Sequence, residues 1–276
     1  MKIGLKKITK RKSLGAINKF YKKRRYLFSK YDQGIKLDDE SWYSVTPESI
    51  GEYLGEKVAQ VSTTEEVNVI DAFAGWGGNI IQFGRFSNKV FGCEIDQTKI
   101  EYCQHNWKIY GVENYKVLLK DYLESNANDY DNKQINAVFL SPPWGGVGYT
   151  QMEKYKFEYM HPNFNDILTK SLEFTRNLIL YIPRNTDVEE ICSVLSIYAS
   201  NISGEERMKE VVFEIERLGH YAGATSILVI YTGNLGNIQT HEIVDHLWEH
   251  YLNLPTDNKN AIKWMIELCK FYLVLF

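Results

Sequence analysis

The stretch Asp71–Asn79 reads DAFAGWGGN and follows directly on an apolar run that begins at Val67. A β-branched run that ends in several glycines predicts a strand over 67–73, a tight turn, and a helix from Asn79 onward. Glycines at such a turn permit φ values above zero and let backbone amides approach a ligand closely. The stretch therefore predicts a ligand site at a strand-to-helix turn of an α/β fold.

Short β-branched runs alternate with helical stretches after this loop. We expect strands at 89–95, 115–119, 135–140, 177–182, 210–217 and 226–232, and helices at 97–110 and 187–200. Alternating strands and helices require a mostly parallel sheet covered on both faces, whereas the last two strands leave no room for a helix between them. We therefore expect an antiparallel pair at one edge of the sheet. This arrangement resembles class I (Rossmann-like) methyltransferases, in which ligands bind at the carboxyl ends of the strands.

The charge of the chain is unevenly distributed. Residues 1–36 hold thirteen Lys or Arg and a single acid, Asp32, although the whole chain has a formal net charge of −3. Aromatic residues are interleaved with these cations, and such a pattern can stack on bases while the cations meet phosphates. We expect a basic arm at 1–19, a helical lobe at 20–60 that completes the active site, a core at 61–235 and a C-terminal helical extension at 236–276. The alternative for the arm is a solubilising tail.

Several classes of protein are disfavoured. No stretch reaches the about 18 uncharged apolar residues of a membrane span, and the N-terminus is charged where a secretory signal has an apolar core. The four cysteines are widely spaced, which predicts neither disulfides nor a thiolate metal site. The stretch His246–His250 (HLWEH) matches an inverted zinc-protease motif, but we interpret it as the solvated face of a helix. We expect an intracellular protein with no membrane partner and no metal.

Acidic residues at the strand ends indicate the kind of ligand. Glu94 ends the second strand, and a carboxylate at this spacing from Asp71 suits the ribose hydroxyls of a nucleotide-like cofactor. The glycine loop lacks the GxGxxG order of a pyrophosphate binder, and Asp71 suits the ammonium of a methionine moiety. We therefore favour S-adenosylmethionine over a dinucleotide. Asp96 competes with Glu94 for the ribose, and Asp121 with Tyr122 either brackets the adenine or forms an ordinary turn. Further donor contacts are expected from Phe73, Ala74, Gly75 and Asn79.

A second loop, Ser141–Gly146 (SPPWGG), ends the fourth predicted strand. Two adjacent prolines keep its backbone out of a helix and leave the carbonyl groups of Ser141 and Pro142 without a local donor. Those carbonyls can accept the N–H bonds of a substrate amine, and Trp144 can stack on a base. The equivalent loop of adenine and cytosine amino-methyltransferases reads Asp or Asn, Pro, Pro and an aromatic residue. We expect Ser141, Pro142 and Trp144 to be catalytic; the alternative is a rigid turn with a core tryptophan.

Five segments together resemble the trimethylguanosine synthase family. They are 27–35, 42–48, 71–79, 139–146 and 183–185. That family methylates the guanine N2 of 7-methylguanosine RNA caps, and the likeness covers roughly residues 20–233 with the motifs in order. It implies a class I fold with a small N-terminal helical lobe.

The resemblance also implies residue roles. Ser44 and Thr46 are implied to help hold the donor, and Ser141 and Trp144 to hold the guanine. The implied contacts to the cap phosphates are Lys23 or Arg24, Tyr149 and Arg184. Asn185 is expected to contact the substrate as well, and Phe28 or Tyr31 is expected to add a second ring against the base. The chain departs from the family pattern at Trp76, where a small residue is usual.

The expected function is therefore S-adenosylmethionine-dependent methylation of cap guanine N2 in small nuclear and nucleolar RNAs. The products would be 2,7-dimethyl- and 2,2,7-trimethylguanosine caps, made in the nucleus or nucleolus by a monomer that ribonucleoprotein proteins recruit. We expect the amine to attack the donor methyl directly, with most of the acceleration coming from positioning. The alternatives are an adenine or cytosine amino-methyltransferase and a non-catalytic cap-binding module.

Overall fold

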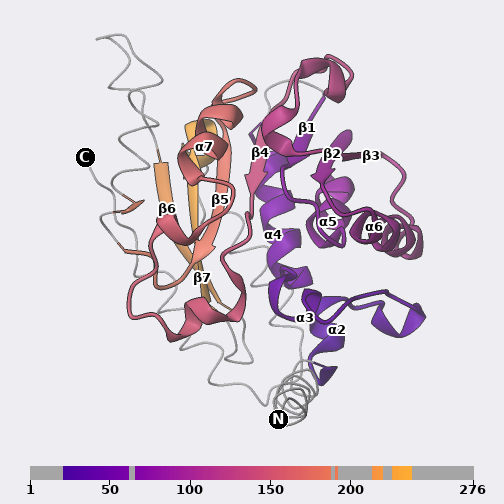
Figure 1. The fold of residues 1–276 in the computed structure, drawn as a ribbon. Coiled ribbons are helices and arrows are strands. Elements are labelled where there is room, and N and C mark those ends of the chain that lie inside the picture. Colours follow the sequence, from indigo (N-terminus) through magenta and orange to yellow (C-terminus); the bar gives the residue numbers. More distant parts are fainter. Residues whose placement is uncertain (1–20, 62–65, 188–189, 192–212, 220–225, 238–276) are drawn as a thin grey trace, which may run out of the picture.

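A computed structural model describes residues 21–61, 66–187, 190–191, 213–219 and 226–237. Its seven strands form one sheet in the order β3-β2-β1-β4-β5-β7-β6 (Figure 1). The strands are β1 (Asn68–Asp71), β2 (Lys89–Glu94), β3 (Tyr115–Leu119), β4 (Ala137–Leu140), β5 (Leu178–Pro183), β6 (Phe213–Gly219) and β7 (Ser226–Thr232). Strands β1 to β5 pair in parallel, whereas β7 is antiparallel to both β5 and β6. The predicted α/β fold and its antiparallel edge are confirmed.

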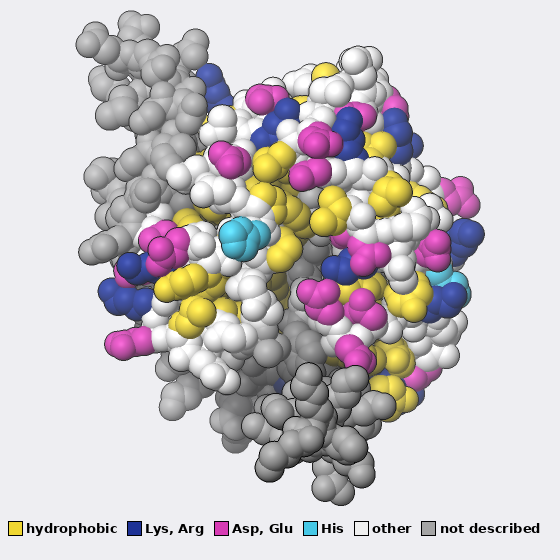
Figure 2. All heavy atoms as spheres, viewed as in Figure 1, with side chains coloured by type: hydrophobic (Ala, Val, Ile, Leu, Met, Phe, Trp, Pro, Cys, Tyr) yellow, Lys and Arg dark blue, Asp and Glu magenta, His cyan; other side chains and the backbone are white. Residues whose placement is uncertain are grey.

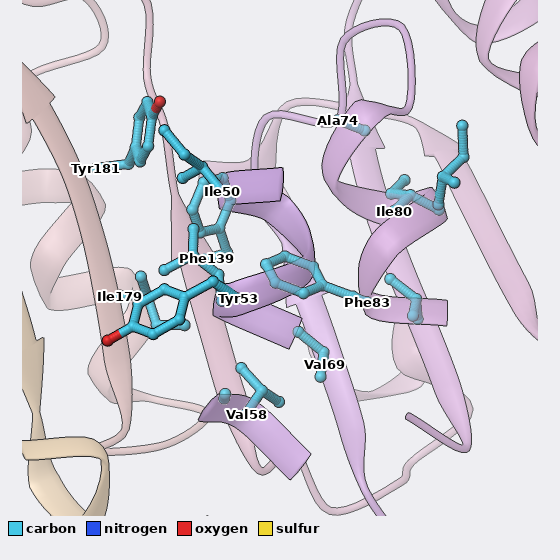
Figure 3. Close-up of a cluster of buried hydrophobic side chains, with 14 of the residues drawn as sticks. Ile50, Tyr53, Val58, Val69, Ala74, Ile80, Phe83, Phe139, Ile179 and Tyr181 are labelled. Atoms are coloured by element: carbon cyan, nitrogen blue, oxygen red, sulfur yellow. The ribbon is translucent and has the colours of Figure 1, made fainter. Parts of the chain in front are cut away.

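Helices cover both faces of the sheet. The helices α4 (Glu48–Ala59), α5 (Gly78–Phe86) and α6 (Gln97–Tyr110) lie on one face, and α7 (Phe164–Leu172) lies on the other (Figure 1). Side chains of successive strand residues point to opposite faces, so the core divides into two clusters. Figure 3 shows the first cluster, where α4 and α5 pack against the sheet through the side chains of Tyr53, Phe83 and Phe139. Val138 of the same strand belongs to the second cluster.

The predicted N-terminal lobe is helical and shares this core. It contains α2 (Arg24–Leu27), the 3₁₀ turn η1 (Tyr31–Gln33), α3 (Ser41–Ser44) and α4. Leu27, Phe28, Ile35 and Trp42 are buried in the same cluster as the sheet residues. Helix α4 also approaches α5 closely, because a Cβ atom at Gly55 would lie 2.7 Å from the ring of Phe86. Figure 1 shows α2 and α3 beyond the carboxyl end of β4, where ligands are expected.

Some predicted features fall outside the described residues. They are the basic arm at 1–19, most of the helix at 187–200, and the C-terminal extension with its HLWEH motif. Within the described ranges, no group of three or more His, Cys, Asp or Glu could hold a metal ion. No helix in that part of the chain has the length and apolarity to cross a bilayer.

Candidate active site

The glycine loop between β1 and α5 is held in a compact turn. The N–H of Ala74 donates to the carbonyl of Cys93 at 2.9 Å, and the N–H of Gly77 donates to that of Ala74 at 2.9 Å. Gly77 has a φ of 85°, and a Cβ atom there would lie 2.6 Å from the Cys103 sulfur of α6. Only glycine meets both conditions, which explains why the sequence at this turn is rich in it.

Asp71 ends β1 beneath this loop with its side chain fully buried. One carboxylate oxygen accepts the N–H of Phe73 at 3.2 Å, while the other is buried and has no partner among the described residues. Burial raises the pKa of Asp71 to about 7, the N–H of Phe73 opposes the shift, and the charge of Glu94 adds to it. A buried carboxylate oxygen without a partner suits a cationic ligand group, as predicted for the donor's ammonium.

Glu94 closes the other side of the loop. Its carboxylate accepts the N–H groups of Gly75 at 2.9 Å, Ile95 at 2.9 Å and Asp96 at 3.0 Å. Two carboxylate oxygens have about four acceptor positions, so Glu94 can still bind a hydroxyl group. Its competitor Asp96 instead caps α6 by accepting the N–H of Thr98 at 2.8 Å. The geometry therefore favours Glu94 for the ribose.

Asp121 and Tyr122, which follow β3, do not bracket an adenine as predicted. Asp121 accepts the N–H of Leu123 at 2.9 Å and caps the 3₁₀ turn η2 (Tyr122–Glu124), as in the ordinary-turn alternative. The ring of Tyr122 is only 2 % exposed, and its hydroxyl is 2.9 Å from the Ser171 hydroxyl of α7. That ring supports the half-buried Phe73 from beneath, with centroids 6.1 Å apart. Bracketing of the adenine by the Tyr122 ring is thus contradicted, because the ring lies in the core.

Two apolar residues that the prediction missed lie at this edge. Ile95 and Leu119 are 74 % and 57 % exposed, although both are large hydrophobic side chains. They follow or end neighbouring strands, since Glu94 pairs with Leu119 across β2 and β3. The sequence did contain a signal for this surface, because the large apolar residue Ile95 directly follows the strand-end acid Glu94. Ile95 and Leu119 give this edge an apolar surface beside Glu94 that suits a purine ring.

The proline loop presents an aromatic surface. The indole of Trp144 stacks on Tyr181 of β5, with centroids 5.8 Å apart and planes inclined by 22°. Tyr149 meets the same indole edge-on at 5.3 Å. Within the described residues, no group donates a hydrogen bond to the carbonyls of Ser141 or Pro142. The half-buried Trp144 therefore has one face covered, with two unused carbonyl acceptors next to it.

The segment before α4 contributes to the same region. Thr46 is 5 % exposed, and its backbone carbonyl would lie 3.9 Å from a Cβ atom at Gly78, the first residue of α5. Ser44 is exposed, and its hydroxyl donates to the carbonyl of Glu40 at 3.0 Å. Helix α3 also lies beside the 3₁₀ turn η4 (Gly146–Gln151), which follows the proline loop. The chain thus brings the predicted donor and base residues to one end of the sheet.

Unpartnered polar atoms are found at several predicted site residues. Buried side-chain atoms without a hydrogen-bond partner among the described residues occur in Thr46, Asp71, Asn79, Trp144 and Asn185. Folded proteins satisfy nearly all buried polar groups, so such atoms can bind a polar ligand group where they line a site. Figure 2, in the view of Figure 1, shows the surface hollowed near the middle, with hydrophobic side chains gathered beside β4. The atoms of Thr46, Asp71 and Asn79 fit a polar ligand at the glycine loop.

The predicted phosphate contacts divide into two groups. Arg24 and Arg25 both bind Asp32, at 3.2 Å and 2.6 Å, and the Arg24 guanidinium lies 4.6 Å from the ring centroid of Tyr21. Lys23 is half-buried, and the geometry does not choose between Lys23 and Arg24.

The second group lies beside the proline loop. Arg184 is exposed, and its charge lowers the pKa of Tyr149 against the larger effect of burial, which raises it. Asn185 donates both amide hydrogens to carbonyl groups, those of Tyr149 at 3.0 Å and Met152 at 2.8 Å. The amide hydrogens of Asn185 thus hold the turn η4 in place, while its Oδ1 is buried without a partner among the described residues, so the substrate contact of Asn185 stays a prediction.

Phe28 does not have its predicted role. Its ring is 1 % exposed and packs against Tyr110 of α6, with centroids 6.3 Å apart. A stacking role at the base is contradicted, because both faces of Phe28 are covered by the core. Tyr31, the other candidate, is half-buried and contacts Trp42 at 5.5 Å.

Trp76, the departure from the family pattern, is accommodated against α6. Its side chain is 5 % exposed, and the Lys99 amine lies 4.6 Å from its ring centroid. A cation at this distance from an indole face is a favourable contact. Trp76 is thus part of the donor loop, and its large side chain is buried against α6.

Comparison with known proteins decides the family. Residues 66–234 match the family model described as RNA cap guanine-N2 methyltransferase. The chain belongs to this family. It is therefore an S-adenosylmethionine-dependent methyltransferase that acts on RNA, and the dinucleotide alternative is excluded.

Several relatives of this RNA cap methyltransferase are known. It is 37 % identical over 187 residues to trimethylguanosine synthase of Schizosaccharomyces pombe, covering 66 % of this chain and 77 % of that protein. It is 34 % identical over 182 residues to trimethylguanosine synthase of Saccharomyces cerevisiae, covering 64 % of this chain but only 58 % of that protein. Among solved structures, a putative RNA methyltransferase of Pyrococcus horikoshii superposes with a TM-score of 0.46 at 14 % identity, covering 76 % of this chain and 97 % of that one.

Proposed function

We propose that this protein methylates the exocyclic N2 amino group of the 7-methylguanosine cap of RNA. The products are 2,7-dimethyl- and 2,2,7-trimethylguanosine caps. The observation that carries the proposal is the stacking of Trp144 on Tyr181 beside the unused carbonyls of Ser141 and Pro142. In a cap guanine-N2 methyltransferase, an aromatic face next to two acceptors fits a base that carries an amino group.

The glycine loop supplies the donor site. When bound, S-adenosylmethionine provides an electrophilic methyl group on its sulfonium. The unpaired Oδ2 of Asp71 fits the ammonium of its methionine part, and Glu94 fits the ribose hydroxyls. Ile95 and Leu119 offer the apolar surface for the adenine. Thr46 and Asn79 add buried oxygen atoms beside the start of α5.

The proline loop supplies the acceptor site. The carbonyls of Ser141 and Pro142 accept the two N–H bonds of the guanine amine and fix its orientation. The indole of Trp144 holds the base by stacking on its free face, while Tyr181 keeps the indole in place. An amine needs little help from a general base when it is oriented in this way, so positioning provides most of the acceleration.

The cap phosphates and the RNA chain lie at the basic residues in this proposal. Tyr149 contacts Trp144 of the proline loop and is influenced by the charge of Arg184, and Lys23 or Arg24 of the N-terminal lobe is the further cation in this proposal. The basic arm then contacts the RNA beyond the cap. The proposed substrates are small nuclear and nucleolar RNAs, methylated in the nucleus or nucleolus by a monomer that ribonucleoprotein proteins recruit.

A single incubation tests the activity. The protein is mixed with S-adenosylmethionine and 7-methyl-GTP, and the nucleotide is weighed by mass spectrometry. Gain of one or two methyl groups on 7-methyl-GTP, with none on uncapped RNA, supports the proposal. Methylation of adenine or cytosine in uncapped RNA contradicts it. Binding of 7-methyl-GTP without any binding of S-adenosylhomocysteine identifies a non-catalytic module instead.

A further inference from the structure

Polar side chains of helix α6 form hydrogen bonds to the N-terminal lobe and thereby hold it against the core. His105 lies 2.8 Å from the carbonyl of Gly34, and the Tyr110 hydroxyl donates to Glu48 at 2.6 Å. Glu48 in turn accepts the hydroxyl of Ser29 at 2.8 Å. The helix begins three residues after the proposed ribose ligand Glu94, where Asp96 caps it. Helix α6 therefore contacts both the donor loop and the N-terminal lobe, which leads to the proline loop.

Asn106 connects these two sides directly. It is fully buried in α6, and its Oδ1 accepts the N–H of Lys36 at 2.8 Å. Its Nδ2 donates to the carbonyl of Lys36 at 2.9 Å and to the carbonyl of Trp76 at 3.1 Å. The backbone partners fix the amide orientation, because an N–H must meet the oxygen and the carbonyls must meet the nitrogen. All three hydrogen bonds of this side chain go to backbone atoms of the two segments.

Each of those segments leads to one half of the site. Trp76 lies inside the donor loop, between Gly75, whose N–H binds Glu94, and Gly77. Lys36 precedes α3, whose first N–H, that of Ser41, donates to Asp38 at 2.8 Å. Helix α3 lies beside η4 and hence beside the turn that carries Tyr149. A shift of either segment breaks hydrogen bonds to the same amide.

A second bridge runs parallel to the first. The Lys99 amine lies over the ring of Trp76 at 4.6 Å and pairs with Glu40 at 3.2 Å. Glu40 precedes the first residue of α3. The side chain of Lys99 is 22 % exposed, so this bridge is accessible to substitution at a smaller risk to folding than Asn106.

We infer that Asn106 is a positioning residue that couples the donor loop to α3 and η4, the elements beside the proline loop. Through this coupling, donor binding raises the affinity for the cap. This inference rests on the proposed function. Ordering of the donor loop holds the Trp76 carbonyl, and with it Asn106 and Lys36, in the arrangement that places α3 beside η4. Coupling between two sites is reciprocal, so cap binding raises donor affinity by the same factor.

The experiment measures the dissociation constant of 7-methyl-GTP by calorimetry, with and without saturating S-adenosylhomocysteine. The ratio of the two constants is the coupling. We expect a wild-type ratio within the about 5- to 150-fold range of known couplings, and a ratio near one for Asn106→Ala. Lys99→Gln should lower the ratio part of the way while folding normally.

Asn114→Ala is the matched control. Asn114 also donates its amide to two backbone carbonyls, those of Gly84 at 2.9 Å and Ser87 at 2.5 Å, but it does so at the far end of α5 from the donor loop. It should keep the wild-type ratio even if its melting temperature falls. An unchanged ratio in Asn106→Ala overturns the inference. If Asn106→Ala does not fold, an unchanged ratio in Lys99→Gln overturns it. A ratio near one in Asn114→Ala also overturns it. Absence of any 7-methyl-GTP binding in the wild type overturns the proposed function itself, and this inference with it.

Discussion

Asp71 and Glu94 end neighbouring parallel strands, and the charge of Glu94 adds to the effect of burial in raising the pKa of Asp71. The two carboxylates nevertheless accept different numbers of backbone N–H groups. Glu94 accepts three backbone N–H groups, whereas Asp71 accepts one and keeps its second oxygen buried and unpaired. Asp71 thus carries a charge that the described residues alone do not satisfy, and this makes its protonation sensitive to the donor.

Donor affinity should depend on pH through Asp71. The pKa of about 7 means that Asp71 is protonated below neutrality in the donor-free protein, and a neutral carboxyl cannot pair with the ammonium. Affinity for S-adenosylhomocysteine should be level above about pH 8 and fall about tenfold per pH unit well below 7. Calorimetry between about pH 5.5 and about pH 8.5 measures this dependence. Asp71→Asn should bind weakly at every pH, and Asp96→Asn, which alters only the cap of α6, should behave as the wild type.

The same shift predicts how stability depends on pH without the donor. The folded-state pKa of Asp71 lies above its unfolded value, so the folded state binds more protons than the unfolded chain. This carboxyl therefore stabilises the fold at low pH, and its contribution is lost as the pH rises from about 4 to about 7. Urea titrations of the wild type and Asp71→Asn should differ in this window. A parallel pH dependence in the two proteins contradicts the assignment.

Tyr122→Phe separates a core role from a ligand role. Removal of the hydroxyl breaks the buried contact with Ser171 and should reduce the free energy of unfolding by about 1 kcal/mol. Affinity for S-adenosylhomocysteine should stay unchanged, since the ring itself is retained beneath Phe73. Urea denaturation and calorimetry give the two quantities. A large loss of affinity for S-adenosylhomocysteine at unchanged stability would show that Tyr122 contacts the donor after all.

The sheet and the two ligand loops could be predicted because they depend on local patterns. Alternating runs place Val138 and Phe139 on opposite faces of β4, and the glycine and proline loops each follow directly on a strand. Strand limits were less accurate, since β1 ends at Asp71 and not at residue 73. The N–H groups of Ala72 and Ala74 still donate to the carbonyls of Phe139 and Cys93, and the backbone turns at Gly75 and Gly77, where φ is positive.

The roles that failed depend on contacts between distant parts of the chain. Phe28 lies among cations in the sequence, as a base-stacking residue would, but its ring packs on Tyr110. Tyr122 follows the strand-end Asp121, as an adenine-binding residue would, but its hydroxyl lies against Ser171 in the core. Neither partner is visible from the composition or spacing around the residue.

Two truncations test the division between arm and core. Deletion of residues 1–19 should weaken RNA binding and flatten its salt dependence, by about 0.7 in slope for each phosphate of a single strand that the arm no longer neutralises. Activity on 7-methyl-GTP should persist. Deletion through Tyr31 removes Phe28 from the core and the Ser29 bonds to Glu48, so it should abolish that activity. Binding at several salt concentrations and turnover of the isolated nucleotide give the results; activity in the longer truncation contradicts the placement of this segment.

Trp144 should make prior N7 methylation a requirement. A 7-methylguanine ring is positively charged, and an indole face attracts a cation by about 0.5–1 kcal/mol when exposed and about 2 kcal/mol or more when desolvated. In the proposed site the base stacks on the indole face opposite Tyr181, and the half-buried position of the indole favours the stronger limit. The wild type should therefore use 7-methyl-GTP with a kcat/KM at least about tenfold above that for GTP.

Substitutions at the same position measure how much of this preference the indole provides. Trp144→Phe keeps a smaller ring on Tyr181, so it should retain some activity and lose part of the preference, because Trp attracts a cation better than Phe does. Trp144→Ala should lose turnover and still bind S-adenosylhomocysteine, since the donor loop is untouched. The measurement is kcat/KM on both nucleotides for each variant. Equal use of 7-methyl-GTP and GTP by the wild type, or an unchanged preference in Trp144→Ala, would mean that the indole only packs against Tyr181, and cap selection would then need another source.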